Sequence, residues 1–127
     1  MLKVVLVGFG GMLGSVLRYL VNLYAPKVLG PEFPFATLFV NVLGGVFIGF
    51  VMGLSQSYED FSPELRLFLT TGIAGGFTTF SAFSYETLNL LVPGTHWVGI
   101  WNIACNVLLS VVAVFVGKSL AQLFVSP

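Results

Sequence analysis

The chain has 127 residues and no formal net charge, because five basic residues balance five acidic ones. Hydrophobic residues make up 57% of it and charged residues only 8%, whereas soluble domains carry about 25% charged residues. This composition excludes a soluble enzyme and a basic nucleic-acid-binding protein. With a mean hydropathy of +0.99, it predicts an all-α membrane protein that forms a single transmembrane domain over residues 1–127.

Four apolar stretches are long enough to cross a bilayer, which takes about 20 helical residues. We expect the four transmembrane helices at about residues 4–23, 35–54, 65–91 and 97–124. A loop containing Pro26 and Pro31 should end the first helix. Ser62 followed by Pro63 has the pattern of a helix start before the third. The sequence therefore predicts a multi-pass protein of the cell (inner or plasma) membrane.

Small residues four apart predict where these helices touch, because they allow two backbones to approach closely. Such pairs occur in the first three apolar stretches. They are Gly10 and Gly14, Gly45 and Gly49, Gly49 and Gly53, and Gly72 and Gly76.

The third stretch should be broken near its middle, at Gly75-Gly76-Phe77-Thr78, because glycine gains least from being helical. In lipid, carbonyl groups freed by such a break must be satisfied by protein, water or an ion. After the break, Phe80 and Phe83 lie on one helical face, and Ser81 with Ser84 on an adjacent one. An aromatic stripe beside a polar stripe predicts part of a conduction path.

Further polar side chains lie deep in the apolar stretches, where each is costly and marks either an interhelical contact or a functional site. For a lone Asn or Ser the interhelical contact is the commoner role. Arg18 either reaches toward the interface or attracts anions in a vestibule, and Glu86 is either a structural acid or a proton or cation site. The others are Thr37 and Asn41, then Asn102, Asn106 and Ser110, and the sequence leaves the role of Asn102 and Asn106 open.

Charge gives only a weak preference for one orientation in the membrane. Lys3, Arg66 and Lys118 lie on the side of the termini, against Lys27 and Arg18 on the other. A protein with so little bias can insert both ways, and two opposite copies can then form a two-fold dimer.

Three segments together resemble the Fluc (CrcB) fluoride ion channel family. The resemblance implies an antiparallel dual-topology homodimer with two fluoride pores, which gives passive fluoride efflux and lowers cytoplasmic fluoride. The segments lie in the first three stretches, in the family's order and spacing. They are Gly10-Gly11-Met12-Leu13-Gly14-Ser15-Val16-Leu17-Arg18-Tyr19, Thr37-Leu38-Phe39-Val40-Asn41-Val42-Leu43-Gly44 and Gly75-Gly76-Phe77-Thr78-Thr79-Phe80-Ser81-Ala82-Phe83.

The resemblance also implies roles for single residues. Phe80 and Phe83 match the two pore phenylalanines, Asn41 matches the pore asparagine, and Arg18 matches the arginine of the family's first helix, at a vestibule. Other residues would lie along or near a polar track, namely Thr37, Ser81, Ser84, Glu86 and Ser110. The backbone carbonyls of Gly75 and Thr78 match those that hold a structural Na⁺ at the dimer centre. Ala82 stands where many members have Thr.

The partners implied are therefore fluoride, membrane lipid and a second copy of the chain, and not nucleic acid. An alternative function is a small dual-topology, proton-coupled exporter of cationic compounds that uses Glu86, but it leaves the break and the phenylalanine pair unexplained. A third alternative, a non-transporting assembly subunit, does not account for the deep polar residues. The sequence contains no Walker loop, Cys/His pair or metal-ligand cluster that would indicate an enzyme.

Overall fold

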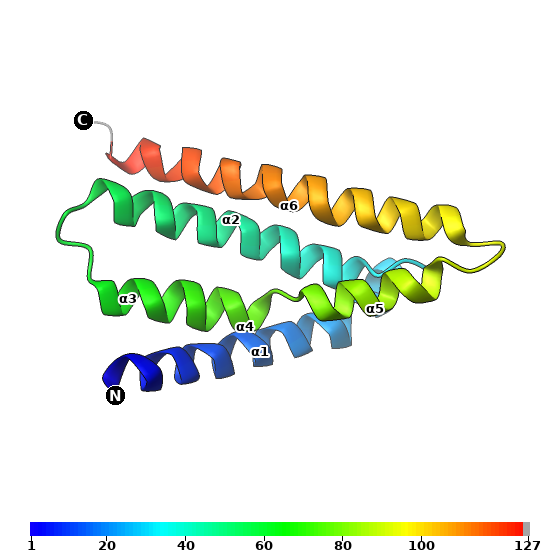
Figure 1. The fold of residues 1–127 in the computed structure, drawn as a ribbon, viewed down its shortest axis with the longest axis horizontal. Helices are drawn as coiled ribbons and strands as arrows, with labels where there is room; N and C mark the ends of the chain where they lie inside the picture. The colour runs from blue at the N-terminus through cyan, green and yellow to red at the C-terminus, as the bar shows by residue number, and fades with distance from the viewer. Residues whose placement is uncertain (126–127) are drawn as a thin grey trace.

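The computed structural model describes residues 1–125, which fold into long helices lying side by side (Figure 1). The elements in order are α1 (Leu2–Leu29), α2 (Phe35–Ser57), α3 (Pro63–Leu67), the π-helix η1 (Phe68–Ala74), α4 (Gly75–Phe77), α5 (Phe80–Leu90) and α6 (His96–Val125). α3, η1, α4 and α5 together form one broken helix, so the predicted all-helical chain with an interrupted third helix is confirmed. α1 begins and α6 ends at the same end of the bundle (Figure 1).

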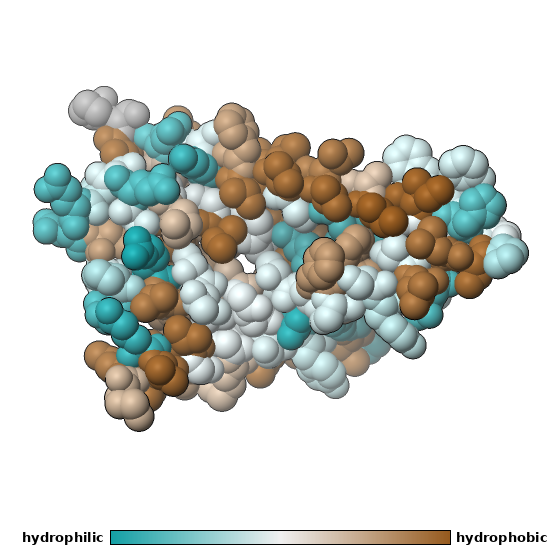
Figure 2. Space-filling model, viewed as in Figure 1, coloured by the Kyte–Doolittle hydropathy of each residue, from teal (hydrophilic) through white to brown (hydrophobic). Residues whose placement is uncertain are grey.

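Three of these helices, α1, α2 and α6, are long and apolar enough to cross a membrane. The broken helix runs alongside them, in the position expected for the remaining span (Figure 1). Hydrophobic side chains cover much of the face formed by α6, while hydrophilic residues gather at the end that holds the α2–α3 loop (Figure 2). This distribution fits a bundle whose flanks contact lipid.

The first helix is longer than expected, because Pro26 lies inside α1 instead of in a loop. Proline removes the hydrogen bond that its own N–H would give to the carbonyl four residues earlier, but the rest of the turn can persist. α1 continues to Leu29 and is followed by Gly30, whose φ of 86° is accessible to glycine at little cost.

The broken helix starts as predicted, with the Ser62 Oγ accepting a 3.2 Å hydrogen bond from the Leu65 N–H and Pro63 in the first turn. The break lies at the end of the stretch predicted for it, Gly75-Gly76-Phe77-Thr78. Gly75 and Gly76 are helical, and the chain becomes extended at Thr78 and Thr79.

Close packing explains why Gly76 stays helical. A Cβ added at Gly76 would lie 3.0 Å from the Gly11 Cα, so glycine here allows α1 to approach α4. Gly14 serves the same contact from the α1 side, because a Cβ added there would lie 2.8 Å from the Phe77 backbone nitrogen. Gly10 packs against η1, where an added Cβ would lie 3.0 Å from the Gly72 Cα. The glycine pairs therefore act as packing positions, as the sequence predicted.

α2 packs most extensively against α6, and α1 packs against η1 and α4 (Figure 1). Gly45 and Gly49 bring α2 against the α6 backbone: a Cβ added at Gly45 would lie 3.0 Å from the Ser110 carbonyl oxygen. The break thus lies between α1 on one side and the closely packed pair of α2 and α6 on the other.

Candidate functional site

The break consists of two extended residues between α4 and α5. Thr78 has ψ of 161°, and Thr79 has φ of −154° and ψ of 122°. The Thr78 N–H still donates to the Ala74 carbonyl over 2.9 Å, which completes the last turn of α4. The Thr79 Oγ1 accepts from the Ala82 N–H over 3.2 Å and caps the start of α5. The chain therefore leaves one helix and enters the next with defined ends.

Side chains from other helices satisfy the peptide groups that the break frees. The Arg18 Nη1 on α1 donates to the Thr78 carbonyl oxygen over 3.1 Å. On α2, the Asn41 Oδ1 accepts from the Thr79 N–H over 2.9 Å, and its Nδ2 donates to the Thr79 carbonyl over 3.2 Å. One side-chain amide thus replaces both hydrogen bonds that Thr79 would make in a helix. This is the protein-based satisfaction that an open backbone requires in lipid.

Asn41 also joins a longer series of amides that extends into α6. Its Nδ2 donates to the Asn106 Oδ1 over 2.9 Å, and the Asn106 Nδ2 donates to the Asn102 Oδ1 over 2.9 Å. The Asn102 Nδ2 then donates to the Thr87 Oγ1 on α5 over 2.8 Å. We call Asn41, Asn106, Asn102 and Thr87 the amide chain. Its location shows that Asn102 and Asn106, left unassigned from sequence, make interhelical contacts.

The phenylalanine pair occupies the first turn of α5, directly after the break. The two ring centroids are 5.4 Å apart, and the ring planes are inclined by 59°. Phe83 is 7% exposed, whereas Phe80 is 78% exposed. The structure therefore brings the two rings together and leaves one of them open on a face of this single chain.

A groove of about 740 Å³ runs past the break between the broken helix, α2 and α6. None of its lining residues, all in the described part of the chain, carries a charge. The groove brings together six of the predicted site residues: Asn41, Gly75, Thr78, Phe80, Phe83 and Ser110. Their convergence from α2, α4, α5 and α6 was not evident from any single helix.

The serine hydroxyl groups are placed differently from one another. The Ser84 Oγ donates to the Phe80 carbonyl over 2.9 Å, and the Ser81 Oγ lies 3.4 Å from the Thr79 Oγ1. The Ser110 Oγ is buried and has no hydrogen-bond partner within residues 1–125. A buried hydroxyl without a partner is costly, which makes Ser110 a candidate contact for a ligand in the groove.

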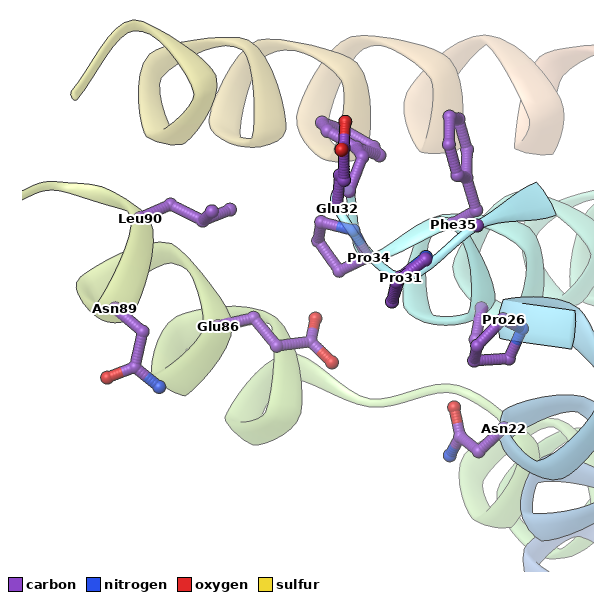
Figure 3. A pocket seen from close by; sticks show the side chains of 12 residues that line it. Asn22, Pro26, Pro31, Glu32, Pro34, Phe35, Glu86, Asn89 and Leu90 are labelled. Carbon is purple, nitrogen blue, oxygen red and sulfur yellow. The ribbon is translucent and has the colours of Figure 1, made fainter. Parts of the chain in front are cut away.

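Glu86 and Thr37 form a separate part of the candidate site. The Thr37 Oγ1 donates to the Glu86 Oε1 over 2.7 Å. Glu86 projects from α5 toward the loop that contains Pro31 and Pro34 (Figure 3). It lines a cavity of about 410 Å³, which Asn22 also lines. These two predicted residues are therefore next to each other, and Glu86, one turn after Phe83 on α5, lines a different cavity from the phenylalanine pair.

Arg18 reaches neither cavity lining but lies half-buried beside the break. Within the described residues no cluster of three His, Cys, Asp or Glu side chains could hold a metal ion. Gly75 and Thr78, whose carbonyls the family resemblance implies as cation ligands, both line the groove. The Thr78 oxygen has a second lone pair beside the one that accepts from Arg18.

Sequence reasoning missed the pairing of Asn41 with Thr79 and that of Arg18 with Thr78. The sequence marks the deep amide on α2, but it does not decide whether the partner of this amide is a neighbouring helix or an ion. The signal that could have found it is the match between one amide, with a donor and an acceptor, and one extended peptide unit that lacks both partners.

Comparison with known proteins gives a consistent result. Residues 5–118 match the family described as CrcB-like protein, Camphor Resistance (CrcB). The chain is 49% identical over 122 residues to the fluoride-specific ion channel FluC of Rhizobium meliloti (strain 1021), covering 96% of this chain and 98% of that protein. It is 46% identical over 123 residues to FluC of Clostridium perfringens (strain 13 / Type A), covering 97% and 96%. FluC of Dehalococcoides mccartyi (strain CBDB1) is 45% identical over 121 residues, covering 95% and 93%.

Proposed function

The chain belongs to the CrcB family, and on that premise we propose that it is a fluoride-specific ion channel. It would let fluoride leave the cell passively and so lower cytoplasmic fluoride. The relatives that match nearly its whole length are named as such channels. The three apolar helices make it a multi-pass membrane protein.

The observation that carries the proposal is the start of α5 inside an uncharged groove. Phe80 and Phe83 lie in the first turn of this half-helix, and the N-terminus of a half-helix favours anionic groups in membrane transporters. The rim of a phenyl ring is electropositive, so ring edges can face an anion without adding a full charge. Full positive charge in the groove would bind fluoride too tightly to release it.

Hydroxyl and amide donors can replace the water that fluoride loses. Ser110 lines the groove and offers a buried hydroxyl group that has no partner within the described residues. Asn41 also lines the groove, but its Nδ2 already donates to the Thr79 carbonyl and to Asn106, so one of these bonds would have to open for Asn41 to bind fluoride. The half-buried Arg18 guanidinium adds positive potential near the break, without lining the groove. In this proposal, Arg18 draws anions toward the vestibule while the neutral donors bind them.

The functional unit would be an antiparallel dual-topology homodimer with two pores. The exposed Phe80 and the open groove support this, because a second copy would cover them. Two copies related by a two-fold axis would present the Gly75 and Thr78 carbonyls from opposite directions. One Na⁺ on the axis could then bind both pairs, as carbonyl oxygens at the C-terminal ends of half-helices do in transporters.

The polar track would continue from Ser81 and Ser84 along α5 to Glu86 and Thr37. The 410 Å³ cavity beside Glu86 would then be the second mouth of the pore. The Thr37 hydroxyl, which donates to Glu86, would have to turn away for an anion to pass close to it.

The test is fluoride efflux from liposomes that contain only this protein. A potassium ionophore supplies the balancing charge, and a fluoride electrode follows release. We expect fluoride to leave without any proton gradient, while chloride stays. Chloride leaving as fast as fluoride would overturn the proposal.

The exporter alternative has one supporting observation, the partnerless Glu86 Oε2, which is buried within the described structure beside the 410 Å³ cavity. An exporter would need a proton gradient and would lose coupling in Glu86→Gln. A passive fluoride channel would keep its ion selectivity whether or not a proton gradient is imposed, which separates the two functions.

A further inference from the structure

We propose that Asn102 and Asn106 are positioning residues, which fix the orientation of Asn41 and thereby hold the break and the phenylalanine pair in place. The inference rests on the proposed channel function and deepens it. It assigns a role on α6, where the sequence resemblance was weakest. The amide chain carries the inference through three observations: its direction, its burial and the points it connects.

The hydrogen bonds of the amide chain all run in one direction. The Thr79 N–H donates to Asn41, Asn41 to Asn106, Asn106 to Asn102, and Asn102 to Thr87. An asparagine amide can in principle be turned by half a rotation, which exchanges its oxygen and its nitrogen. In the amide chain, turning one side-chain amide would place two donors or two acceptors against each other.

Two fixed backbone groups set that direction from opposite ends. The Thr79 N–H can only donate, so it requires the Asn41 oxygen. The Asn102 backbone carbonyl can only accept, and it receives the Asn106 Nδ2 over 3.1 Å. The Asn102 Oδ1 accepts the other N–H bond of the same amide, so the backbone and the side chain of Asn102 together hold the Asn106 oxygen toward Asn41. The orientation of Asn41 is therefore specified by α6 as well as by the break.

Burial makes this specification effective. Asn102 is 0% exposed and Asn106 is 4% exposed, so water cannot readily replace a lost amide partner. A buried amide without a partner is costly. Asn106 borders the groove, but Asn102 lines neither cavity. Asn102 can therefore act on the pore only through its neighbours.

The amide chain also contacts α5 at two places. One end reaches Thr79 at the N-cap, and the other reaches Thr87, eight residues later and about 12 Å along a helix. Phe80 and Phe83 lie between these points. The amide chain thus connects α2 and α6 to both ends of the α5 segment that carries the Phe80 and Phe83 rings.

The experiment measures two quantities in Asn102→Leu, which keeps a similar volume and removes the amide. The first is hydrogen exchange at the Thr79 amide in lipid nanodiscs, which requires no transport. We expect it to rise by about tenfold or more, because its acceptor loses orientation. The second is the ratio of fluoride to chloride efflux, which should fall. Unchanged values of both would overturn the inference.

Matched variants separate positioning from packing. Thr87→Val removes the terminal hydroxyl at nearly constant volume and should raise Thr79 exchange, whereas Thr87→Ser keeps the hydroxyl and should restore it. Gln56→Leu, an exposed amide at the end of α2, should leave both quantities unchanged. Equal effects of Thr87→Val and Thr87→Ser would show a packing effect and contradict the role of the chain.

A double-mutant cycle tests whether Asn102 acts through Asn41. In an Asn41→Ala background, adding Asn102→Leu should cause no further loss of fluoride selectivity. Additive losses would overturn the inference. If the unmodified protein passed no fluoride, the proposed function would fail, but Thr79 exchange would still decide whether the amide chain positions the break.

Discussion

The Arg18 guanidinium on α1 donates a 3.1 Å hydrogen bond to the Thr78 carbonyl oxygen, across a sequence separation of 60 residues. A charged residue in an apolar helix thus reaches the point where the broken helix opens. The sequence offered two roles for Arg18, an interfacial charge or a vestibule charge. The structure adds a contact that neither role includes. Arg18 donates to the Thr78 carbonyl oxygen, which is one of the oxygens proposed to bind Na⁺.

Arg18→Leu should therefore loosen the break and lower fluoride flux. Loss of a hydrogen bond from a charged donor costs about 1.5–3 kcal/mol when its acceptor stays buried. Arg18→Lys can still donate and should retain more flux. Thermal unfolding in detergent and efflux from liposomes measure the two effects. Equal flux in Arg18→Leu and the unmodified protein would show that this contact is dispensable.

Phe80→Ile and Phe83→Ile should each lower fluoride flux, because an aliphatic side chain has no electropositive rim. Phe83 is buried, so its variant should also lose some stability, whereas Phe80 is largely exposed in the single chain. Phe115→Ile on α6 is the matched control, since this side chain is 71% exposed and lies outside the groove lining. Efflux normalised to folded protein gives the comparison. Normal flux in both pore variants would make the two rings packing residues only.

Asn41→Asp should impair flux more than its small change in shape suggests. A carboxylate keeps an acceptor for the Thr79 N–H but has no N–H to give to the Thr79 carbonyl or to Asn106. A negative charge beside the groove would also repel fluoride, at a cost that falls steeply with distance and screening. Efflux assays would reveal the loss. Flux at the normal level would show that Asn41 need not donate any hydrogen bond.

Replacing sodium with a large organic cation on both sides of the membrane should lower fluoride flux or loosen the proposed dimer. The expected site contains backbone carbonyls and no carboxylate, which favours a monovalent ion over calcium or magnesium. Efflux and cross-linking before and after the exchange measure the outcome. If fluoride flux and cross-linking were identical in sodium-free solution, the structural ion would not be needed.

Gly14→Ala should destabilise the contact between α1 and α4, because the added Cβ would lie 2.8 Å from the Phe77 backbone nitrogen. Overpacking of this kind costs about 1–3 kcal/mol. Gly8→Ala lies on the same helix with nothing within 4 Å of the added atom and should be neutral or slightly stabilising. Thermal unfolding compares the two. Equal stability of both variants would refute close packing at Gly14.

The sequence was sufficient to predict the helices, because the apolar stretches are long and the loops contain strong turn residues. It was also sufficient to predict that the third helix breaks. It could not show that the break begins only at Thr78, because Gly76 favours opening by its intrinsic propensity but is held helical by its contact with Gly11. The competing term comes from tertiary packing, which no local pattern in the third stretch records.

The candidate site shows the same division. Phe80 and Phe83 could be predicted as neighbours, because they are three residues apart on one helix. The pairing of Asn41 with Thr79, separated by 38 residues, depends on how α2 lies beside the break. Pro26 was likewise misplaced by local sequence alone. Proline favours a turn, yet α1 continues through this residue to Leu29.

The π-helix η1 has a consequence for how the chain can change in length. A π-turn accommodates a residue that an α-helix would not, and each residue added to or removed from a helix rotates everything beyond it by about 100°. η1 therefore sets the angular phase between Ser62 and Phe80. A deletion within Phe68–Ala74 would rotate the helical face that contacts α1 away from α1. The loop between α5 and α6, in contrast, can lose a residue without rotating any helical face. Tolerance to insertions and deletions should thus differ sharply between two segments of similar length.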